Sequence, residues 1–143
     1  MSDIFKHPGL ISNSQRASLL GQRGVVVWLT GLSGSGKSTL AYLAEKTLLE
    51  KGKFACVLDG DNLRHGLNKD LGFSAEDRAE NIRRLSHVAT LLASSGVITI
   101  VSAISPFTAD REEARKVSFD AGHAFVEGFV NTPVEKCSPR GPQ

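Results

Sequence analysis

The sequence has little cysteine and almost no excess of charge of either sign. Its only cysteines, Cys56 and Cys137, lie far apart, with no CxxC spacing and no histidine spaced for zinc. These features disfavour a disulfide scaffold and a structural zinc site, and we expect a reducing, cytoplasmic environment. Seventeen basic residues against fifteen acidic ones leave a net charge of +2. We therefore expect no general affinity for nucleic acid, and any bound anion must be held by a local site.

Long apolar runs are also missing. No stretch approaches the roughly 20 apolar residues of a membrane span. The first six residues carry Asp3 and lead into no apolar segment of the kind found in secretory signals. We therefore expect no membrane partner. With 41% hydrophobic and 22% charged residues over 143 positions, the composition predicts one globular domain with a real core.

Apolar runs and helical patterns alternate along the chain. The run at 25–29, VVVWL, is unbroken and rich in β-branched residues, which is typical of a strand buried on both faces. Further strands are predicted at 55–58, 97–101 and 125–130, and helices at 37–51, about 74–95 and 110–119. This alternation predicts an α/β fold, a parallel sheet flanked by helices. We expect a lead-in segment at 1–23, with a short helix at 14–20 capped by Ser14, and a domain at 24–143.

A glycine-rich motif, here called the phosphate loop, occupies residues 31–38 between the first strand and the first long helix. Its sequence, GLSGSGKS, matches G-x-x-x-x-G-K-[ST]. Glycines let backbone N–H groups converge on phosphate oxygens, and the helix N-terminus adds partial positive charge. Lys37 would reach the β- and γ-phosphates, and the Ser38 hydroxyl would ligate Mg²⁺. In this strand-to-helix context the motif predicts a site for a nucleoside triphosphate with magnesium, rather than a plain glycine turn.

Two carboxylates follow the second predicted strand. Asp59 and Asp61 come where that strand ends, and ligands bind at the carboxyl ends of parallel strands. Such carboxylates can hold Mg²⁺ through water or accept a proton from an acceptor hydroxyl. Asp61 is also well placed as the N-cap of a short helix at 62–67, and both interpretations can hold for different aspartates.

A cationic set and a loop aromatic come next. The guanidinium groups of these arginines suit phosphate or sulfate oxygens. Asn81 lies three residues after Arg78 and shares a helix face with it. Phe73, just before the helix at 74–95, either stacks on a base or packs on the helix start. Ser105 follows the third strand and precedes a proline, which favours an extended backbone and a projecting hydroxyl, although an ordinary turn also fits. The arginines in question are Arg64, Arg78, Arg83 and Arg84.

Together these motifs resemble the adenylylsulfate kinase family. The matching stretches are WLTGLSGSGKST at 28–39, LDGDNLRHGLNKDLGFSAEDRAENIRRL at 58–85 and ISPF at 104–107, with a looser match, FVNTPVEKC, at 129–137. The resemblance implies a phosphate-loop NTPase fold. It also implies transfer of the γ-phosphate of ATP to the 3′-hydroxyl of adenylyl sulfate, giving 3′-phosphoadenylyl sulfate and ADP in sulfate assimilation.

The resemblance also implies roles for individual residues. Asp61 would be the base or would hold a magnesium-bound water, with Asp59 in support. The phosphosulfate and ribose would be bound by Arg64, Arg78 and Asn81, the adenine would stack on Phe73, and the Ile104 backbone would contact the same nucleotide. The residues implied to bind ATP and magnesium are Gly31, Leu32, Ser33, Gly34, Ser35, Gly36, Lys37, Ser38 and Thr39.

The position of Ser105 matches a serine recorded in the family as a phosphoserine intermediate. Direct in-line transfer needs no protein nucleophile, only positioning and charge neutralisation. We therefore expect Asp61, Lys37 and Ser105 as catalytic residues and keep both routes open. A homodimer is also left open as the assembly.

The chain departs from the family pattern near its end. Gly128 and Asn131 replace a larger apolar residue and an aspartate, and only Arg140 matches the start of the family's lid. We expect the C-terminal lid and last strand to be missing, and such a chain to bind ATP weakly, turn over poorly and self-associate. Two alternatives stay open. One is a nucleotide-binding fragment without turnover, and the other is a gluconate- or shikimate-type kinase, against which the stretch 59–85 argues.

Overall fold

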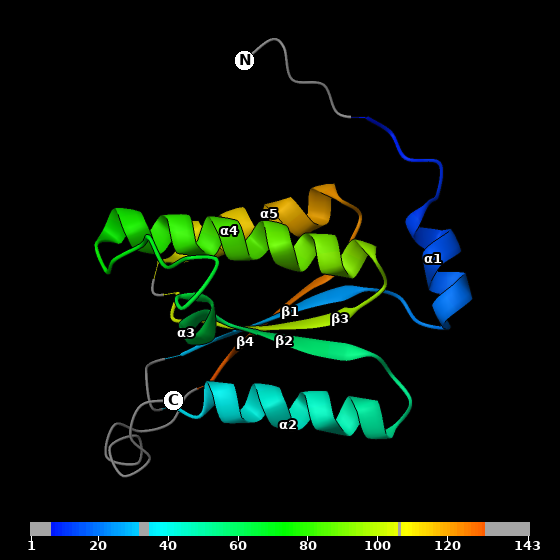
Figure 1. The fold of residues 1–143 in the computed structure, drawn as a ribbon, viewed down its shortest axis with the longest axis horizontal. Helices are drawn as coiled ribbons and strands as arrows, with labels where there is room; N and C mark the ends of the chain where they lie inside the picture. Colours follow the sequence, from blue (N-terminus) through cyan, green and yellow to red (C-terminus); the bar gives the residue numbers. More distant parts are fainter. Residues whose placement is uncertain (1–6, 32–34, 106, 131–143) are drawn as a thin grey trace.

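The computed structural model describes residues 7–31, 35–105 and 107–130. Helices and strands alternate through these ranges, as the sequence predicts (Figure 1). In chain order the elements are α1 (Asn13–Leu20), β1 (Val25–Thr30), α2 (Lys37–Glu50), β2 (Ala55–Asp59), α3 (Gly60–Leu63), α4 (Ala75–Ser94), β3 (Ile98–Ser102), α5 (Thr108–Asp120) and β4 (Phe125–Phe129).

The described strands form one parallel sheet in the order β2-β3-β1-β4. In the central strand β1, Val26 lies opposite Thr99 of β3 and Phe125 of β4. At the end of β2, Asp59 lies opposite Ser102, the last residue of β3. The polar residues that end neighbouring strands therefore meet at one edge of the sheet, and the predicted α/β class is confirmed.

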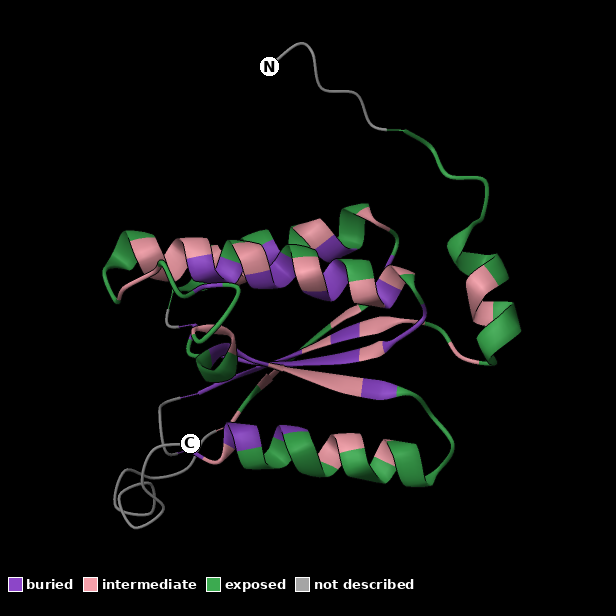
Figure 2. Ribbon diagram, viewed as in Figure 1, coloured by how far each residue is buried: buried purple, intermediate pink, exposed green. Residues whose placement is uncertain are grey.

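Helices cover both faces of the sheet. α2 lies on one face, and α4 and α5 lie together on the other (Figure 1). Val26 and Trp28 of β1 belong to the core cluster that includes α4 and α5, whereas Leu29 belongs to the cluster with Ala41 of α2. The strand is therefore buried on both faces, and buried residues concentrate along the strands and the inner sides of the helices (Figure 2).

Two predicted helix caps were wrong by two residues. Ser12, not Ser14, caps α1, because its Oγ accepts from the backbone N of Gln15 at 3.1 Å while the Gln15 side chain accepts from Ser12 N at 2.8 Å. Similarly, Asp59 caps α3 by accepting from Asp61 N at 2.9 Å, so this helix spans 60–63 rather than 62–67. The predicted cap of α4, Ser74, is confirmed by a 3.1 Å bond from Asp77 N.

Several predicted features lie outside the described residues. They are positions 32–34 of the phosphate loop, a helix expected from 132, and the departures from the family pattern at 131 and 140. Across the ranges that are described, no helix combines the length and apolarity needed to cross a membrane.

Candidate active site

The described part of the phosphate loop requires glycine at two positions. Gly36, the N-cap of α2, has φ 95°, a left-handed conformation that side chains disfavour. A Cβ on Gly31 would lie 2.8 Å from the Val130 carbonyl oxygen and 2.9 Å from Ser35 Oγ. Gly31 therefore allows a close backbone approach and Gly36 a left-handed turn into α2, and the N-terminus of a helix favours an anion.

The first turn of α2 buries a cation and a hydroxyl. Lys37 is 3% exposed, and this burial lowers the pKa of its ammonium, while Asp61 and then Asp59 oppose the shift. Ser38 Oγ lies 3.1 Å from the Oγ of Ser102 at the end of β3. These hydroxyl oxygens are hard donors of the kind Mg²⁺ prefers.

Asp59 and Asp61 have different surroundings. Asp59 is buried: one oxygen caps α3, and the other accepts from the Tyr42 hydroxyl at 3.4 Å. The Tyr42 hydroxyl in turn accepts from Asn62 Nδ2 at 3.1 Å. Burial, followed by the Asp59 charge, raises the pKa of the Tyr42 phenol. Asp59 is thus held in place, whereas the Asp61 carboxylate is exposed at the sheet edge.

Arg64, Phe73 and Arg78 are brought together as predicted from their loop and helix positions. The Arg64 guanidinium carbon lies 4.5 Å from the centroid of the Phe73 ring, and Arg64 Nη1 donates to the Gly72 carbonyl at 2.9 Å. Arg78 Nε donates to the Phe73 carbonyl at 3.0 Å. The ring itself is 71% exposed. This exposure does not support packing on the helix start, and it leaves a ring face for stacking.

The other two arginines of the predicted cationic set form ion pairs with carboxylates of the protein. Arg83 pairs with Glu80 at 2.7 Å, and Arg84 pairs with Glu80 and Asp70, both at 2.8 Å. The two guanidinium groups lower the pKa of Glu80 to about 2. The set available for an anionic ligand therefore narrows to Arg64 and Arg78.

Asn81 is more buried than its predicted role in binding the substrate suggests. It is 4% exposed, and its Oδ1 accepts from Asn68 Nδ2 at 2.6 Å. Asn68 is fully buried, and its own Oδ1 accepts from Arg84 Nη1 at 3.3 Å. This network ties α4 to the turn that follows α3 and carries Arg64.

The predicted projection of the Ser105 hydroxyl was wrong. Ser105 is 1% exposed. Its Oγ accepts from Trp28 Nε1 at 3.1 Å and donates to Thr30 Oγ1 at 2.9 Å. The buried indole N–H of Trp28 needs an acceptor, and this hydroxyl supplies it. Ile104, its neighbour, is 37% exposed.

Sequence reasoning missed Tyr42 and Ser102. Ser102 carried a readable signal, since a polar residue closing an apolar strand lies at the ligand-binding edge of a parallel sheet. Tyr42 carried none, because its contact with Asp59 depends on how α2 lies against β2.

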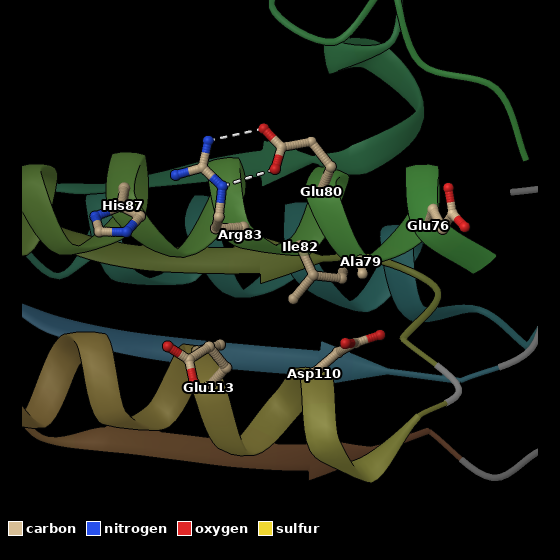
Figure 3. Close-up of a pocket in the computed structure, with 9 residues that line it drawn as sticks. Glu76, Ala79, Glu80, Ile82, Arg83, His87, Asp110 and Glu113 are labelled. Atoms are coloured by element: carbon tan, nitrogen blue, oxygen red, sulfur yellow. Dashed lines mark hydrogen bonds and ion pairs between the residues drawn. The ribbon is translucent and has the colours of Figure 1, made fainter. Parts of the chain in front are cut away.

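A cavity of about 540 Å³ lies between α4 and α5 (Figure 3). The Arg83–Glu80 ion pair lines it, so Arg83 is the one member of the predicted cationic set on its wall. None of the residues that the family resemblance implies as nucleotide or acceptor ligands lines it. In the described ranges no three His, Cys, Asp or Glu side chains gather as a metal site. The candidate site is therefore the sheet edge, where Mg²⁺ would depend on hydroxyls, water and nucleotide phosphates. The cavity is lined by Glu76, Ala79, Glu80, Ile82, Arg83, His87, Asp110, Glu113 and Ala114.

Comparison with known sequences agrees with this geometry. The family model for adenylylsulphate kinase matches residues 23–143. A bifunctional enzyme CysN/CysC of Mycobacterium tuberculosis (strain H37Rv) is 58% identical over 141 residues, or 99% of this chain and 22% of that protein. Adenylyl-sulfate kinase 3 of Arabidopsis thaliana is 51% identical over 142 residues, or 99% of this chain and 67% of that protein. The chain thus spans about a fifth of the first relative and two thirds of the second.

Solved structures show the same relationship. The Mycobacterium tuberculosis APS kinase CysC in complex with AMPPNP and APS is 64% identical, with a TM-score of 0.80 over 83% of this chain and 69% of that chain. A gluconokinase from Sinorhizobium meliloti 1021 has a TM-score of 0.58 at 19% identity, over 83% of this chain and 64% of that chain. The second likeness reflects the fold alone.

Proposed function

Because the chain belongs to the adenylylsulphate kinase family, we propose that it transfers the γ-phosphate of ATP to the 3′-hydroxyl of adenylyl sulfate. The products are 3′-phosphoadenylyl sulfate and ADP, in sulfate assimilation. One contact carries the proposal: Ser38 of the phosphate loop lies 3.1 Å from Ser102, whose register partner is Asp59. The ATP side and the acceptor side therefore adjoin at one sheet edge.

On the ATP side, the N–H groups at the start of α2 and the Lys37 ammonium bind the phosphates. Burial strengthens the attraction of Lys37 for phosphate oxygens, because less water screens its charge. The Ser38 hydroxyl would hold Mg²⁺, with Asp59 or Asp61 acting through water. When bound with ATP, Mg²⁺ neutralises charge on the phosphate oxygens.

On the acceptor side, Asp61 accepts the proton of the 3′-hydroxyl, and Asp59 orients the turn that carries it. Arg64 and Arg78 bind the phosphosulfate, and the exposed Phe73 ring stacks on the adenine. The Ile104 backbone contacts the same nucleotide. Asn81 stays a predicted ribose contact, with its carbonyl oxygen engaged by Asn68.

The transfer is direct and in line, without a phosphoserine. The Ser105 hydroxyl is buried and hydrogen-bonded to Trp28 and Thr30, so a role in holding its loop agrees with its contacts. Positioning and charge neutralisation supply the catalysis that a covalent step would otherwise provide.

The proposal is tested by incubating purified protein and γ-labelled ATP with adenylyl sulfate, and in parallel with gluconate or shikimate. We expect label in 3′-phosphoadenylyl sulfate alone. Lys37→Ala should abolish transfer and weaken ATP binding in calorimetry, since the charge on the β/γ oxygens is lost. Lys46→Ala, which removes an exposed lysine of the same helix, should change neither. Label in a sugar acid, or ATP binding with no product from any acceptor, would reject the proposal.

A further inference from the structure

Arg111 on α5 joins the helix to strand β4 and to the residues that follow β3. Its Nε donates to Glu127 Oε2 of β4 at 2.7 Å. Its Nη2 donates to Thr108 Oγ1 at 3.3 Å, and its Nη1 donates to the carbonyl oxygen of Ser105. Both side chains of the ion pair are largely shielded, at 20% and 25% exposed. All three guanidinium nitrogens are therefore engaged, which fixes the orientation of the group.

One of these partners, Ser105, belongs to the strand-exit loop, defined here as residues 103–105 after β3. On its other side the loop is held by β1: Ala103 N donates to the Leu29 carbonyl at 3.2 Å, and Trp28 Nε1 donates to Ser105 Oγ. Glu127, the partner of Arg111, lies opposite Trp28 in the β1–β4 register. Hydrogen bonds from β1 and from α5 therefore hold the strand-exit loop on two sides.

We propose that Arg111, oriented by Glu127, is a positioning residue that fixes the strand-exit loop for the acceptor nucleotide. This inference rests on the proposed function, in which the backbone of Ile104, a residue that is 37% exposed, contacts adenylyl sulfate. A loop held before binding loses less conformational freedom on binding. Without the Arg111 contact, the acceptor must order the loop itself, and its KM rises while the ATP site is untouched.

Arg115 is the matched control. It pairs with the same Glu127, at 3.2 Å, and its guanidinium carbon lies 5.0 Å from the Phe125 ring centroid. The described contacts of Arg115 join α5 to β4 and do not reach the strand-exit loop. Arg111→Ala and Arg115→Ala therefore both remove one ion pair to Glu127, but only the first releases the loop.

The kinetic test compares these two variants with wild type. We expect Arg111→Ala to raise the KM for adenylyl sulfate about tenfold, the scale of one hydrogen bond to a charged donor. The KM for ATP should stay within about twofold, and Arg115→Ala should leave both constants within about twofold. Glu127→Gln, which keeps the side-chain size, should shift the acceptor KM in the same direction. Equal acceptor effects from Arg111→Ala and Arg115→Ala, or an equal rise in both KM values for Arg111→Ala, would overturn the proposal.

A second readout does not depend on activity. Trp28 is the only tryptophan of the chain, and its indole N–H bonds to the loop, so its fluorescence reports the loop position. We expect Arg111→Ala to increase acrylamide quenching of Trp28 and Arg115→Ala to leave it unchanged. Unchanged quenching in Arg111→Ala would show that Arg111 does not hold the strand-exit loop, and would overturn the proposal even if the kinase is active. If wild type fails to phosphorylate adenylyl sulfate, the proposed function fails. The quenching measurement still decides whether Arg111 holds the strand-exit loop.

Discussion

Replacing Ser105 by alanine distinguishes a structural hydroxyl from a nucleophile. The substitution removes the acceptor of the Trp28 indole N–H and the donor to Thr30 Oγ1. Trp28 is fully buried, so no water reaches the indole nitrogen that loses its partner. A buried donor left without an acceptor costs about 1–3 kcal/mol. For a chain of this length that cost corresponds to a fall in Tm of about 3–10 °C.

The expected effect on catalysis is small by comparison. If transfer is direct, Ser105→Ala should keep kcat within about tenfold, because no bond to Ser105 forms. Removing a true nucleophile typically costs a factor on the order of 10⁶. Thermal unfolding and steady-state kinetics of the same preparations measure both quantities.

Thr30→Val supplies the matched control, since it removes one hydrogen-bond partner and keeps the Ser105 hydroxyl. A structural role predicts lower Tm and retained kcat for both variants. Loss of kcat by several orders of magnitude in Ser105→Ala, with Thr30→Val fully active and Tm unchanged in both, would show that Ser105 is a nucleophile and not a structural residue.

Two further predictions concern Arg78 and His123. Arg78→Ala should weaken adenylyl sulfate binding by about 1.5–3 kcal/mol, the scale of a charge-assisted hydrogen bond, and leave ATP binding unchanged. Calorimetry with Arg83→Ala as control checks this, and equal loss for both ligands would make Arg78 structural. Burial lowers the pKa of His123, whose Nε2 lies 2.7 Å from Ser94 Oγ. The unfolded chain therefore binds more protons below about pH 6.5, and the free energy of unfolding should fall there and level off below the folded pKa. Urea unfolding should show a smaller fall in His123→Gln, and an identical fall would contradict this assignment.

The fold was largely predictable because its signals are local. The unbroken run at 25–29 identified a strand buried on both faces, and the alternation of strands and helices identified the parallel sheet. The caps of α1 and α3 were harder to place. For α1, Gln15 three residues after Ser12 completes a capping box that Ser14 lacks, so this cap could have been read from the sequence. For α3, the local sequence does not decide between Asp59 and Asp61.

The site was predictable where its residues are close in sequence. Arg64, Phe73 and Arg78 belong to one continuous stretch, and the pairing of Glu80 with Arg83 and Arg84 follows helical spacing that could have been read. The burial of Ser105 could not be read, because it depends on Trp28, 77 positions away. The same holds for the contact of Tyr42 with Asp59, which depends on the packing of α2 against β2.

The proposed reaction is a direct transfer of the γ-phosphoryl group from ATP to the 3′-hydroxyl of adenylyl sulfate at the sheet edge. It is tested most directly by one turnover of ATP made chiral at the γ-phosphorus with oxygen isotopes, with purified protein in excess. A single in-line transfer predicts 3′-phosphoadenylyl sulfate whose transferred phosphorus has inverted configuration. Retained configuration, which two successive displacements through Ser105 would produce, would contradict the account, as would the absence of label at the 3′ position.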